Sequence, residues 1–292
     1  MARNHIRNLN LNKLDFATGY PEDNVISGMR FSCDIMIEIN LPLALKDGYE
    51  FYVSKNGVIL SKGQGSDGCI PPAYFKRVFR KEFGKEKEEI DLSPFENLLI
   101  LDFEANCIKD GKLNCQEIIE FPIIPINVQS LDISDNNFHY YIKPTVHTEI
   151  TDFCTELTGI TQDTVNSGIK LEEALEKLEI WMQKNGFNEQ NSIFVTCGRW
   201  DLNSCLKNEA IYKNLNYPNY LKRYINIKDI WCQVMFKNKS AGMKGMLDSF
   251  NLKLEGRHHS GIDDSKNIAK IAVELLKRRG TFTNAQVLLV KN

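Results

Sequence analysis

The segment LLILDFEANC, residues 98–107, limits what this chain can fold into more than any other stretch. Its aliphatic run predicts a strand, and Asp102 and Glu104 lie two residues apart where that run ends. Side chains two residues apart on a strand leave the same face of a sheet, so these carboxylates would form one acidic spot. Such a spot is costly beside an apolar strand unless a cation or water compensates it. Taken alone, the pair is more typical of a solvated strand end than of a metal site.

Over the rest of this region, apolar runs with strand character alternate with segments whose apolar residues have helical spacing. In residues 170–184, Leu171, Leu175 and Leu178 keep the spacing of one helix face. This alternation predicts an α/β layer fold. The expected strands are residues 98–107, 117–126, 138–144 and 192–197, and the expected helices are residues 170–184, a helix from residue 201, and residues 263–280.

A charged stretch that ends in Ser-Pro precedes the first apolar strand and predicts a linker at residues 81–95. Before it, residues 1–80 carry strand-like runs at 34–41 and 49–60 with no long helical period, which predicts a small β-rich module. After it, residues 96–282 contain the acidic segments. A chain of 292 residues is long enough for such a division.

Overall composition restricts the class of protein but does not name a ligand. The formal net charge of −2 does not favour broad phosphate binding, although an enzyme that grips a terminal nucleotide through metal ions needs no basic footprint. The eight cysteines lack close pairs and a His-rich partner segment, which predicts reduced thiols in an intracellular protein, cytoplasmic or nuclear. No apolar run approaches the length of a membrane span, so no membrane association is expected. No pattern indicates a protein partner.

Two further carboxylates lie at the ends of expected elements. Asp201 follows the strand 192–197 and the short link GRW, and active sites of α/β sheets favour such strand ends. The alternative role for Asp201 is a helix N-cap. Asp264 lies four residues before Ile268, on the apolar stripe of the last helix, and is therefore expected to face inward. Asp263 points elsewhere and is the expected capping residue.

His259 precedes the same helix by a turn that contains glycine. A neutral imidazole there can take a proton from an attacking water, although an isolated histidine would more often be an exposed loop residue. Four carboxylates and a histidine suit phosphodiester hydrolysis, in which two divalent ions about 3.5 to 4 Å apart neutralise charge at phosphorus. Hard oxygen ligands favour two Mg²⁺ ions, or Mn²⁺ as a substitute, over zinc.

The segments LLILDFEANC, QEIIEFPI, FCTELTGIT, SIFVTCGRWDL and GRHHSGIDDSKNIA resemble the DEDDh exonucleases of the DnaQ-like, ribonuclease H-like superfamily. Within it, they resemble the histone-mRNA and small-RNA branch that includes the prion-protein-interacting exonuclease. The resemblance runs over about residues 97–280 and implies a ribonuclease H-like mixed sheet flanked by helices. It also implies a 3′-5′ exonuclease that releases nucleoside monophosphates from a single-stranded 3′ end, with RNA favoured and DNA as the alternative.

Carried over residue by residue, the family's metal ligands fall on Asp102, Glu104, Asp201 and Asp264, and its general base falls on His259. Glu104 is thus expected both to bind metal and to act in catalysis. The resemblance further implies that Glu104, Ala105 and His259 contact the terminal nucleotide. His258 leaves a choice between two imidazoles, and His259 is selected because its spacing to Asp264 matches the family.

Residues 3–79 resemble the C-terminal lobe of RNA 2′-phosphotransferases, which use NAD to remove a 2′-phosphate from RNA. The likeness is carried by RNHI, DNVISGMRFSCDIMIEI, DGYEFYVSKNGVIL and GCIPPAYFKRVF, and Arg30 matches one catalytic arginine. The printed sequence contains no match to the family's other lobe, which holds an Arg-His pair. Three alternatives follow for this module: an NAD-dependent transferase in a bifunctional protein, a truncated form of one, or a non-catalytic RNA-binding segment. For the whole chain, the alternative to an enzyme is a non-catalytic RNA-binding protein on an inactive nuclease scaffold.

Overall fold

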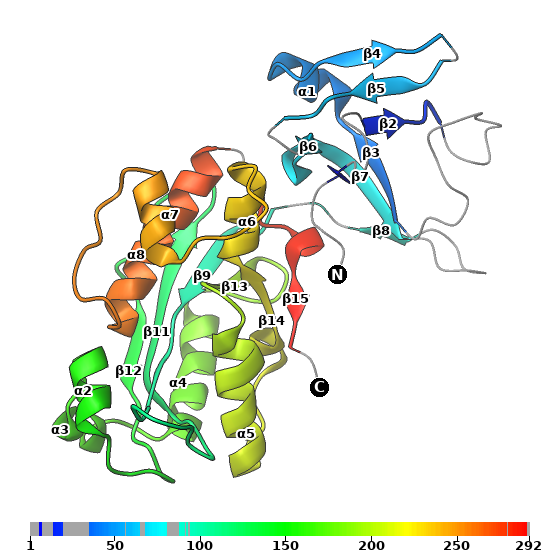
Figure 1. Ribbon diagram of the computed structural model, residues 1–292. Coiled ribbons are helices and arrows are strands. Elements are labelled where there is room, and N and C mark those ends of the chain that lie inside the picture. Colours follow the sequence, from blue (N-terminus) through cyan, green and yellow to red (C-terminus); the bar gives the residue numbers. More distant parts are fainter. Residues whose placement is uncertain are drawn as a thin grey trace. The chain divides into compact units, whose positions relative to one another are not determined.

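The computed structural model describes residues 6–7, 14–19, 35–55, 57–64, 68–80, 88–90, 92, 94–278 and 280–290 (Figure 1). The chain divides into two compact units. One comprises Met1–Pro94 with Asp229–Ser240 and Arg278–Gln286, and the other comprises Phe95–Lys228, Ala241–Lys277 and Val287–Asn292. The expected domain ranges 1–80, 81–95 and 96–282 stay predictions.

The larger unit is built on a mixed sheet of seven strands. Its strand order is β10-β11-β9-β13-β14-β15, and the seventh strand, β12, pairs with β11 outside this order. Strand β9 pairs in parallel with β13 and antiparallel with β11, so the sheet is mixed at its centre. The strands are β9 (Asn97–Leu101), β10 (Glu104–Ala105), β11 (Ile118–Asn127), β12 (Phe138–Tyr141), β13 (Ser192–Thr196), β14 (Arg223–Asn226) and β15 (Leu288–Leu289).

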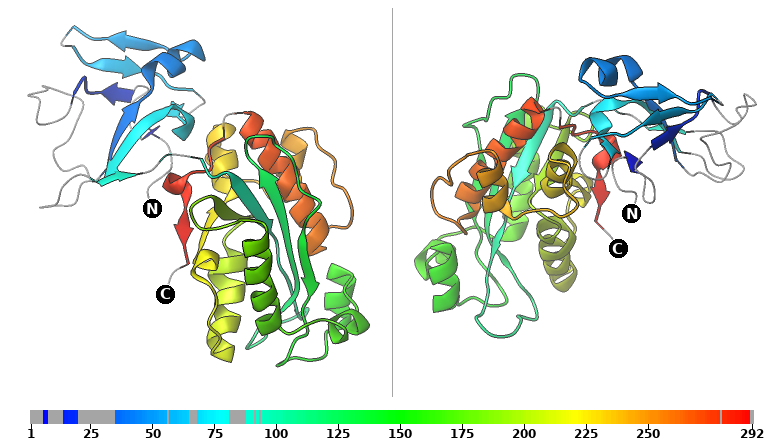
Figure 2. Two further views of the ribbon diagram at one scale, coloured as in Figure 1. Left: turned by 180° about the vertical axis from the view of Figure 1, so that it is seen from behind. Right: turned by 45° about the horizontal axis from the view of Figure 1, so that its top comes forward.

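Helices cover both faces of this sheet (Figures 1 and 2). Leu99 and Leu101 of β9 point to the face that packs against Leu178 of α4. Their neighbours alternate to the opposite face, where α8 packs against β9 and β11. The helices of this unit are α2 (Asp152–Thr158), α3 (Gln162–Asn166), α4 (Leu171–Lys184), α5 (Lys207–Lys213), α7 (Met243–Ser249) and α8 (Gly261–Lys277). Helix α6 (Ile227–Val234) begins in this unit, but most of its residues belong to the other.

The expected α/β architecture, a mixed sheet with flanking helices, is confirmed by this topology. The helix predicted at 170–184 is α4, whose apolar stripe is buried as its spacing requires. The helix predicted from residue 201 begins at Asp201 as a π-helical turn, η3 (Asp201–Leu206), and continues as α5. Single π turns inside helices are often found at functional sites.

The first unit is β-rich, and each of its sheets is small. The strands are β1 (Ile6–Arg7), β2 (Leu14–Phe16), β3 (Ile35–Ile39), β4 (Phe51–Val53), β5 (Ile59–Ser61), β6 (Cys69–Ile70), β7 (Phe75–Arg80) and β8 (Glu88–Ile90). They form the pair β1-β6 and the sheets β2-β5-β4 and β3-β7-β8. A short helix, α1 (Leu41–Lys46), starts at the cap Asn40, whose Oδ1 accepts the Leu43 N–H. The hydrophobic core of this unit includes Ala44, Tyr49 and Tyr74.

The expectation of one strand over 49–60 is wrong, because the structure has an antiparallel hairpin there. Strands β4 and β5 pair through Val53 and Ile59, and Gly57 in the turn adopts a φ of +83°. That left-handed conformation suits glycine, so the chain reverses where the sequence pattern had suggested continuity. Among the described residues, no helix has the length and apolar character needed to cross a membrane.

Candidate active site

Strand pairing fixes the two carboxylates of the first acidic segment. Strand β9 is buried between β11 and β13, and Asp102 follows its last residue. Glu104 opens β10 and lies opposite Glu120 of β11, where the register shifts. The expected strand 98–107 is thus two strands with a break between them, and both carboxylates lie next to that break.

Asp201 is tied to the same break by a backbone hydrogen bond. Its Oδ1 accepts the N–H of Phe103 at 3.0 Å, and the side chain is buried. The alternative role as a helix N-cap does not hold, because Asp201 is already the first helical residue and Trp200 precedes it in a helical conformation. The bond connects the start of η3 directly to the backbone between Asp102 and Glu104.

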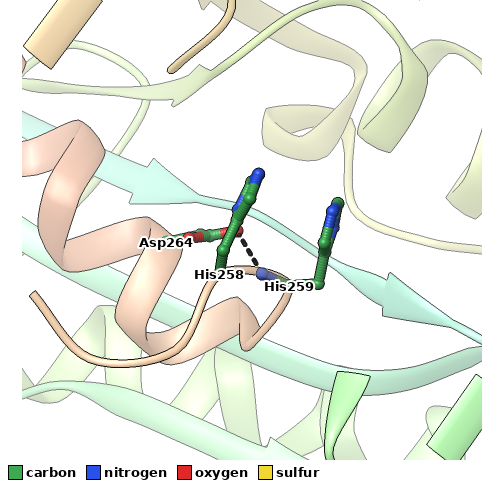
Figure 3. Close-up of side chains that lie close together, drawn as sticks. All are labelled: His258, His259 and Asp264. Atoms are coloured by element: carbon green, nitrogen blue, oxygen red, sulfur yellow. Dashed lines mark hydrogen bonds and ion pairs between the residues drawn. The ribbon is translucent and has the colours of Figure 1, made fainter. Parts of the chain in front are cut away.

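Asp264 faces the acidic segment from the first turn of α8, as the apolar stripe predicts. Its Oδ2 accepts the His259 N–H at 2.9 Å and pairs with His258 Nδ1 at 3.0 Å (Figure 3). Its Oδ1 is buried and has no hydrogen-bond partner in the described part of the chain. Asp102, Glu104 and Asp264 each offer a carboxylate oxygen within 4.8 Å of the others. Asp201 lies outside this tightest group.

The expectation that Asp263 caps α8 is wrong. The helix begins two residues earlier, at Gly261, so Asp263 lies inside its first turn. Its Oδ2 instead accepts the Arg257 N–H at 2.9 Å and closes the turn that carries the histidines. Arg257 Nη2 also donates to the Glu156 carbonyl, which fastens this turn to the end of α2.

The two histidines of that turn differ in what holds them. Their rings stack, with centroids 4.0 Å apart and planes inclined by 16° (Figure 3). The His258 ring pairs with Asp264, whereas His259 contacts Asp264 through its backbone N–H. His259 has a φ of +66° and an exposed ring. Partial desolvation and the neighbouring His258 lower the pKa of His259, which favours the neutral imidazole.

Burial raises the pKa values of three of these carboxylates. Burial, with Glu120 and Asp264, raises the pKa of Glu104 from 4.5 to about 8. Burial likewise raises the pKa of Asp201 to about 6, although the Phe103 N–H opposes the shift. The pKa of Asp102 is well above its ordinary value through burial and the nearby Asp201. A site that disfavours its own negative charges in this way fits a bound divalent cation.

Sequence reasoning missed Glu120, which lies on β11 beside this cluster. Its carboxylate is buried and accepts the N–H groups of Gly261 and Ile262 at the start of α8. The signal was present, since a charged residue inside the apolar run EIIEFPIIPI must be paired or hydrogen bonded.

The remaining expected residues stay predictions. Ala105 is buried on β10, and its carbonyl faces the Cys154 thiol at 3.9 Å. The segment FCTELTGIT forms α2, a left-handed Gly159 and the connection to α3. Arg30 lies outside the described residues, so the proposed match to the transferase arginine is untested.

Comparison with known proteins identifies the family to which the larger unit is related. The exonuclease family model matches residues 99–272. The chain belongs to that family. The chain is similar to ERI1 exoribonuclease 3 of Homo sapiens, with 44% identity over 186 residues, 63% of this chain and 55% of that protein. It is also 35% identical to 3′-5′ exoribonuclease 1 of Rattus norvegicus over 207 residues, 70% of this chain and 59% of that protein.

Solved structures support the same assignment. The crystal structure of the nuclease domain of 3′hExo, a DEDDh family member bound to rAMP, is 34% identical with a TM-score of 0.59 and covers 63% of this chain and 92% of that one. A structure of histone mRNA stem-loop recognition by 3′-exonuclease is 31% identical with a TM-score of 0.61, covering 68% and 92%. The resemblance to DEDDh exonucleases and the ribonuclease H-like fold that it implied are confirmed. The chain spans about half the length of the ERI1 exoribonuclease 3 that it matches.

The first unit has a separate likeness. Residues 1–63 match the model of the RNA 2′-phosphotransferase family, Tpt1/KptA. This match covers a small part of the chain, so it shows a similarity of that segment alone.

The raised pKa values predict how the stability of metal-free protein depends on pH. The folded state keeps a proton on Glu104 that the unfolded chain releases above pH 4.5, so stability falls as pH rises from there to about 8. We expect Glu104→Gln, which has no such proton, to be more stable than wild type in EDTA, by a margin that grows between about pH 5 and pH 8. Thermal unfolding of both proteins across this range measures the margin, and parallel curves would contradict the prediction.

Proposed function

We propose that this chain is a divalent-metal-dependent 3′-5′ exonuclease that hydrolyses the terminal phosphodiester bond of RNA and releases nucleoside monophosphates. The observation that carries the proposal is the group formed by Asp102, Glu104 and Asp264, with oxygens within 4.8 Å of one another. The buried Oδ1 of Asp264 has no hydrogen-bond partner among the described residues, which fits the role of a cation ligand. Membership of the exonuclease family supports the same chemistry.

The donor set suits magnesium, with manganese as a substitute. Asp102, Glu104, Asp201 and Asp264 would hold two such ions, since carboxylate oxygens are the ligands these hard cations prefer. When bound, the ions supply charge neutralisation at phosphorus and at the leaving oxygen. Asp201 keeps one oxygen on the Phe103 N–H, which orients its carboxylate toward the others.

Within the chain, His259 is the proposed general base. Its neutral ring takes a proton from the water that attacks phosphorus, while the bond from phosphorus to the 3′ oxygen breaks. Asp264 accepts the backbone N–H of His259, and the His258 ring stacks against the His259 ring. These contacts position the His259 imidazole without a hydrogen bond from its ring nitrogens to Asp264. Glu104, Ala105 and His259 are the proposed contacts of the terminal nucleotide.

The proposed substrate is a single-stranded 3′ end, with RNA favoured over DNA. A net charge of −2 argues against a grip on long stretches of backbone, whereas capture of one terminal nucleotide needs little basic surface. The solved relative with bound rAMP supports a ribonucleotide at the site. Residues 96–282 are the proposed nuclease domain, and an intracellular location, cytoplasmic or nuclear, is proposed from the cysteine pattern.

The direct test is shortening of a 5′-labelled single-stranded RNA, beside a DNA of the same sequence. Wild type with Mg²⁺ should remove nucleotides stepwise from the 3′ end, and EDTA should stop it. Asp102→Ala should lower the rate by more than about 100-fold, because even outer-shell partners of metal ligands cost about 10–100-fold. A folded wild type that shortens neither strand, with Mg²⁺ or Mn²⁺, would refute the proposal.

The adjacent histidines provide an internal control for the base. His259→Ala should lower kcat by about 10²–10⁴-fold, the usual contribution of general base catalysis, while Mn²⁺ binding stays as in wild type. His258→Ala removes the stacked ring and the Asp264 pairing but not the base, so its loss of kcat should be smaller. Single-turnover rates and Mn²⁺ titration separate the effects, and a larger loss in His258→Ala would assign the base to His258.

A second candidate function follows from the match of residues 1–63 to RNA 2′-phosphotransferases. That activity would transfer a 2′-phosphate from RNA to NAD. Incubation of the protein with 2′-phosphorylated RNA, NAD and EDTA tests this activity without interference from a metal-dependent nuclease. NAD-dependent removal of the phosphate would make the protein bifunctional, whereas RNA binding without removal would assign the segment to docking.

A further inference from the structure

We propose that Glu120 is a positioning residue that fixes the start of α8 and thereby sets where Asp264 lies relative to Asp102 and Glu104. This inference rests on the proposed function, because it concerns the same carboxylate group. It adds a residue that binds neither the metal nor the nucleotide.

The carboxylate of Glu120 joins three elements. Oε2 accepts the Gly261 N–H at 2.9 Å, and Oε1 accepts the Ile262 N–H at 3.1 Å. Oε1 also pairs with His139 Nε2 of β12 at 2.8 Å. Both amides belong to the first turn of α8, whose N–H groups have no partners within the helix. Glu120 therefore attaches the start of α8 to strand β11 of the sheet.

Close packing at Gly261 makes this attachment unusually tight. A Cβ on Gly261 would lie 2.8 Å from the Asp102 carbonyl oxygen and 3.1 Å from Glu120 Oε2. Contacts below 3.0 Å are not accommodated when the opposing atom is backbone. The helix start thus lies directly against the residue that carries the first carboxylate. Asp264 comes three residues later, within the same turn, so any shift of Gly261 moves Asp264 as well.

A carboxylate suits this position better than an amide. Its two oxygens accept two backbone N–H groups and an imidazole, and its negative charge is stabilised at a helix N-terminus. A glutamine has one acceptor oxygen, and its NH₂ would face an amide N–H of α8. The three donors also offset the cost of burying a charge that is 1% exposed next to other carboxylates.

Glu120 is not itself placed as a metal ligand. Both of its oxygens already accept hydrogen bonds, whereas Asp264 Oδ1 accepts none in the described residues. It is also absent from the described groups whose ligand atoms converge within 4.8 Å. Its effect on metal binding should therefore pass through the position of α8.

The chain provides a matched control in Glu117, just before the same strand. Glu117 is fully buried and accepts the N–H groups of Thr145, Val146 and His147, and it pairs with Lys213 at 2.8 Å. It therefore has the same kind of buried, backbone-bonded carboxylate without contact to α8. Glu117→Gln should affect stability without affecting the metal site.

The experiment is Mn²⁺ titration of the full chain by calorimetry in the absence of RNA, with thermal unfolding to verify folding. Glu120→Gln should weaken Mn²⁺ binding by about 10–100-fold, the range for groups that orient metal ligands, while Glu117→Gln should match wild type. Loss of a nearby negative charge would also weaken binding in Glu120→Gln. Two variants remove that ambiguity because they retain the charge.

Glu120→Asp keeps the charge but is one methylene too short to hold both amides. Gly261→Ala leaves Glu120 intact and displaces the helix start directly. Both should weaken Mn²⁺ binding as Glu120→Gln does, with lower kcat at limiting metal and an unchanged KM for RNA. If both match Glu117→Gln while Glu120→Gln is weak, Glu120 acts through its charge alone and the inference fails. If wild type neither binds Mn²⁺ nor shortens RNA, the proposed function itself fails.

Discussion

Mutual repulsion among buried carboxylates is the constraint on which the rest of this site depends. Asp102, Glu104 and Asp264 approach within 4.8 Å of one another, on the face of the sheet that α8 covers. Burial, together with the neighbouring carboxylates, raises the pKa values of Asp102 and Glu104, so folding must hold the group in place against an electrostatic cost. The backbone supplies that hold, because each carboxylate lies at the end of a paired strand or in the first turn of a helix.

The two faces of the sheet have different roles in holding this group of carboxylates. On one face, β9 and α4 bury aliphatic side chains such as Leu99 and Leu178 in a large apolar core. The other face carries the acidic residues and receives α8. Burial of apolar area on the first face stabilises the strands and offsets part of the cost of the charges on the second. Removing the charge repulsion stabilises many sites of this kind but removes their function, which is the usual conflict between stability and activity.

Sequence reasoning placed the acidic residues well because each follows an element with a clear period. Asp102 follows an apolar run, and Asp264 continues the stripe of α8. It failed where tertiary hydrogen bonds decide the outcome. The start of α8 moved to Gly261 because Glu120, far away in the sequence, takes the first amides, and no local pattern encodes that bond. The hairpin at Gly57 did have a local signal, since Asn-Gly at residues 56–57 is typical of a tight hairpin turn, and it was missed because the two flanking runs were interpreted as one strand.

The separate hydrogen bonds around the site meet in the turn between Arg257 and Asp264. Asp263 holds the Arg257 backbone, and Arg257 fastens the turn to α2. Asp264 holds His259 by its backbone and His258 by its ring. A single helical turn therefore controls both a candidate metal ligand and the candidate base. Because Glu120 anchors that turn to the sheet, ligand and base would move together, and a displacement that weakens metal binding would also misplace the proton acceptor.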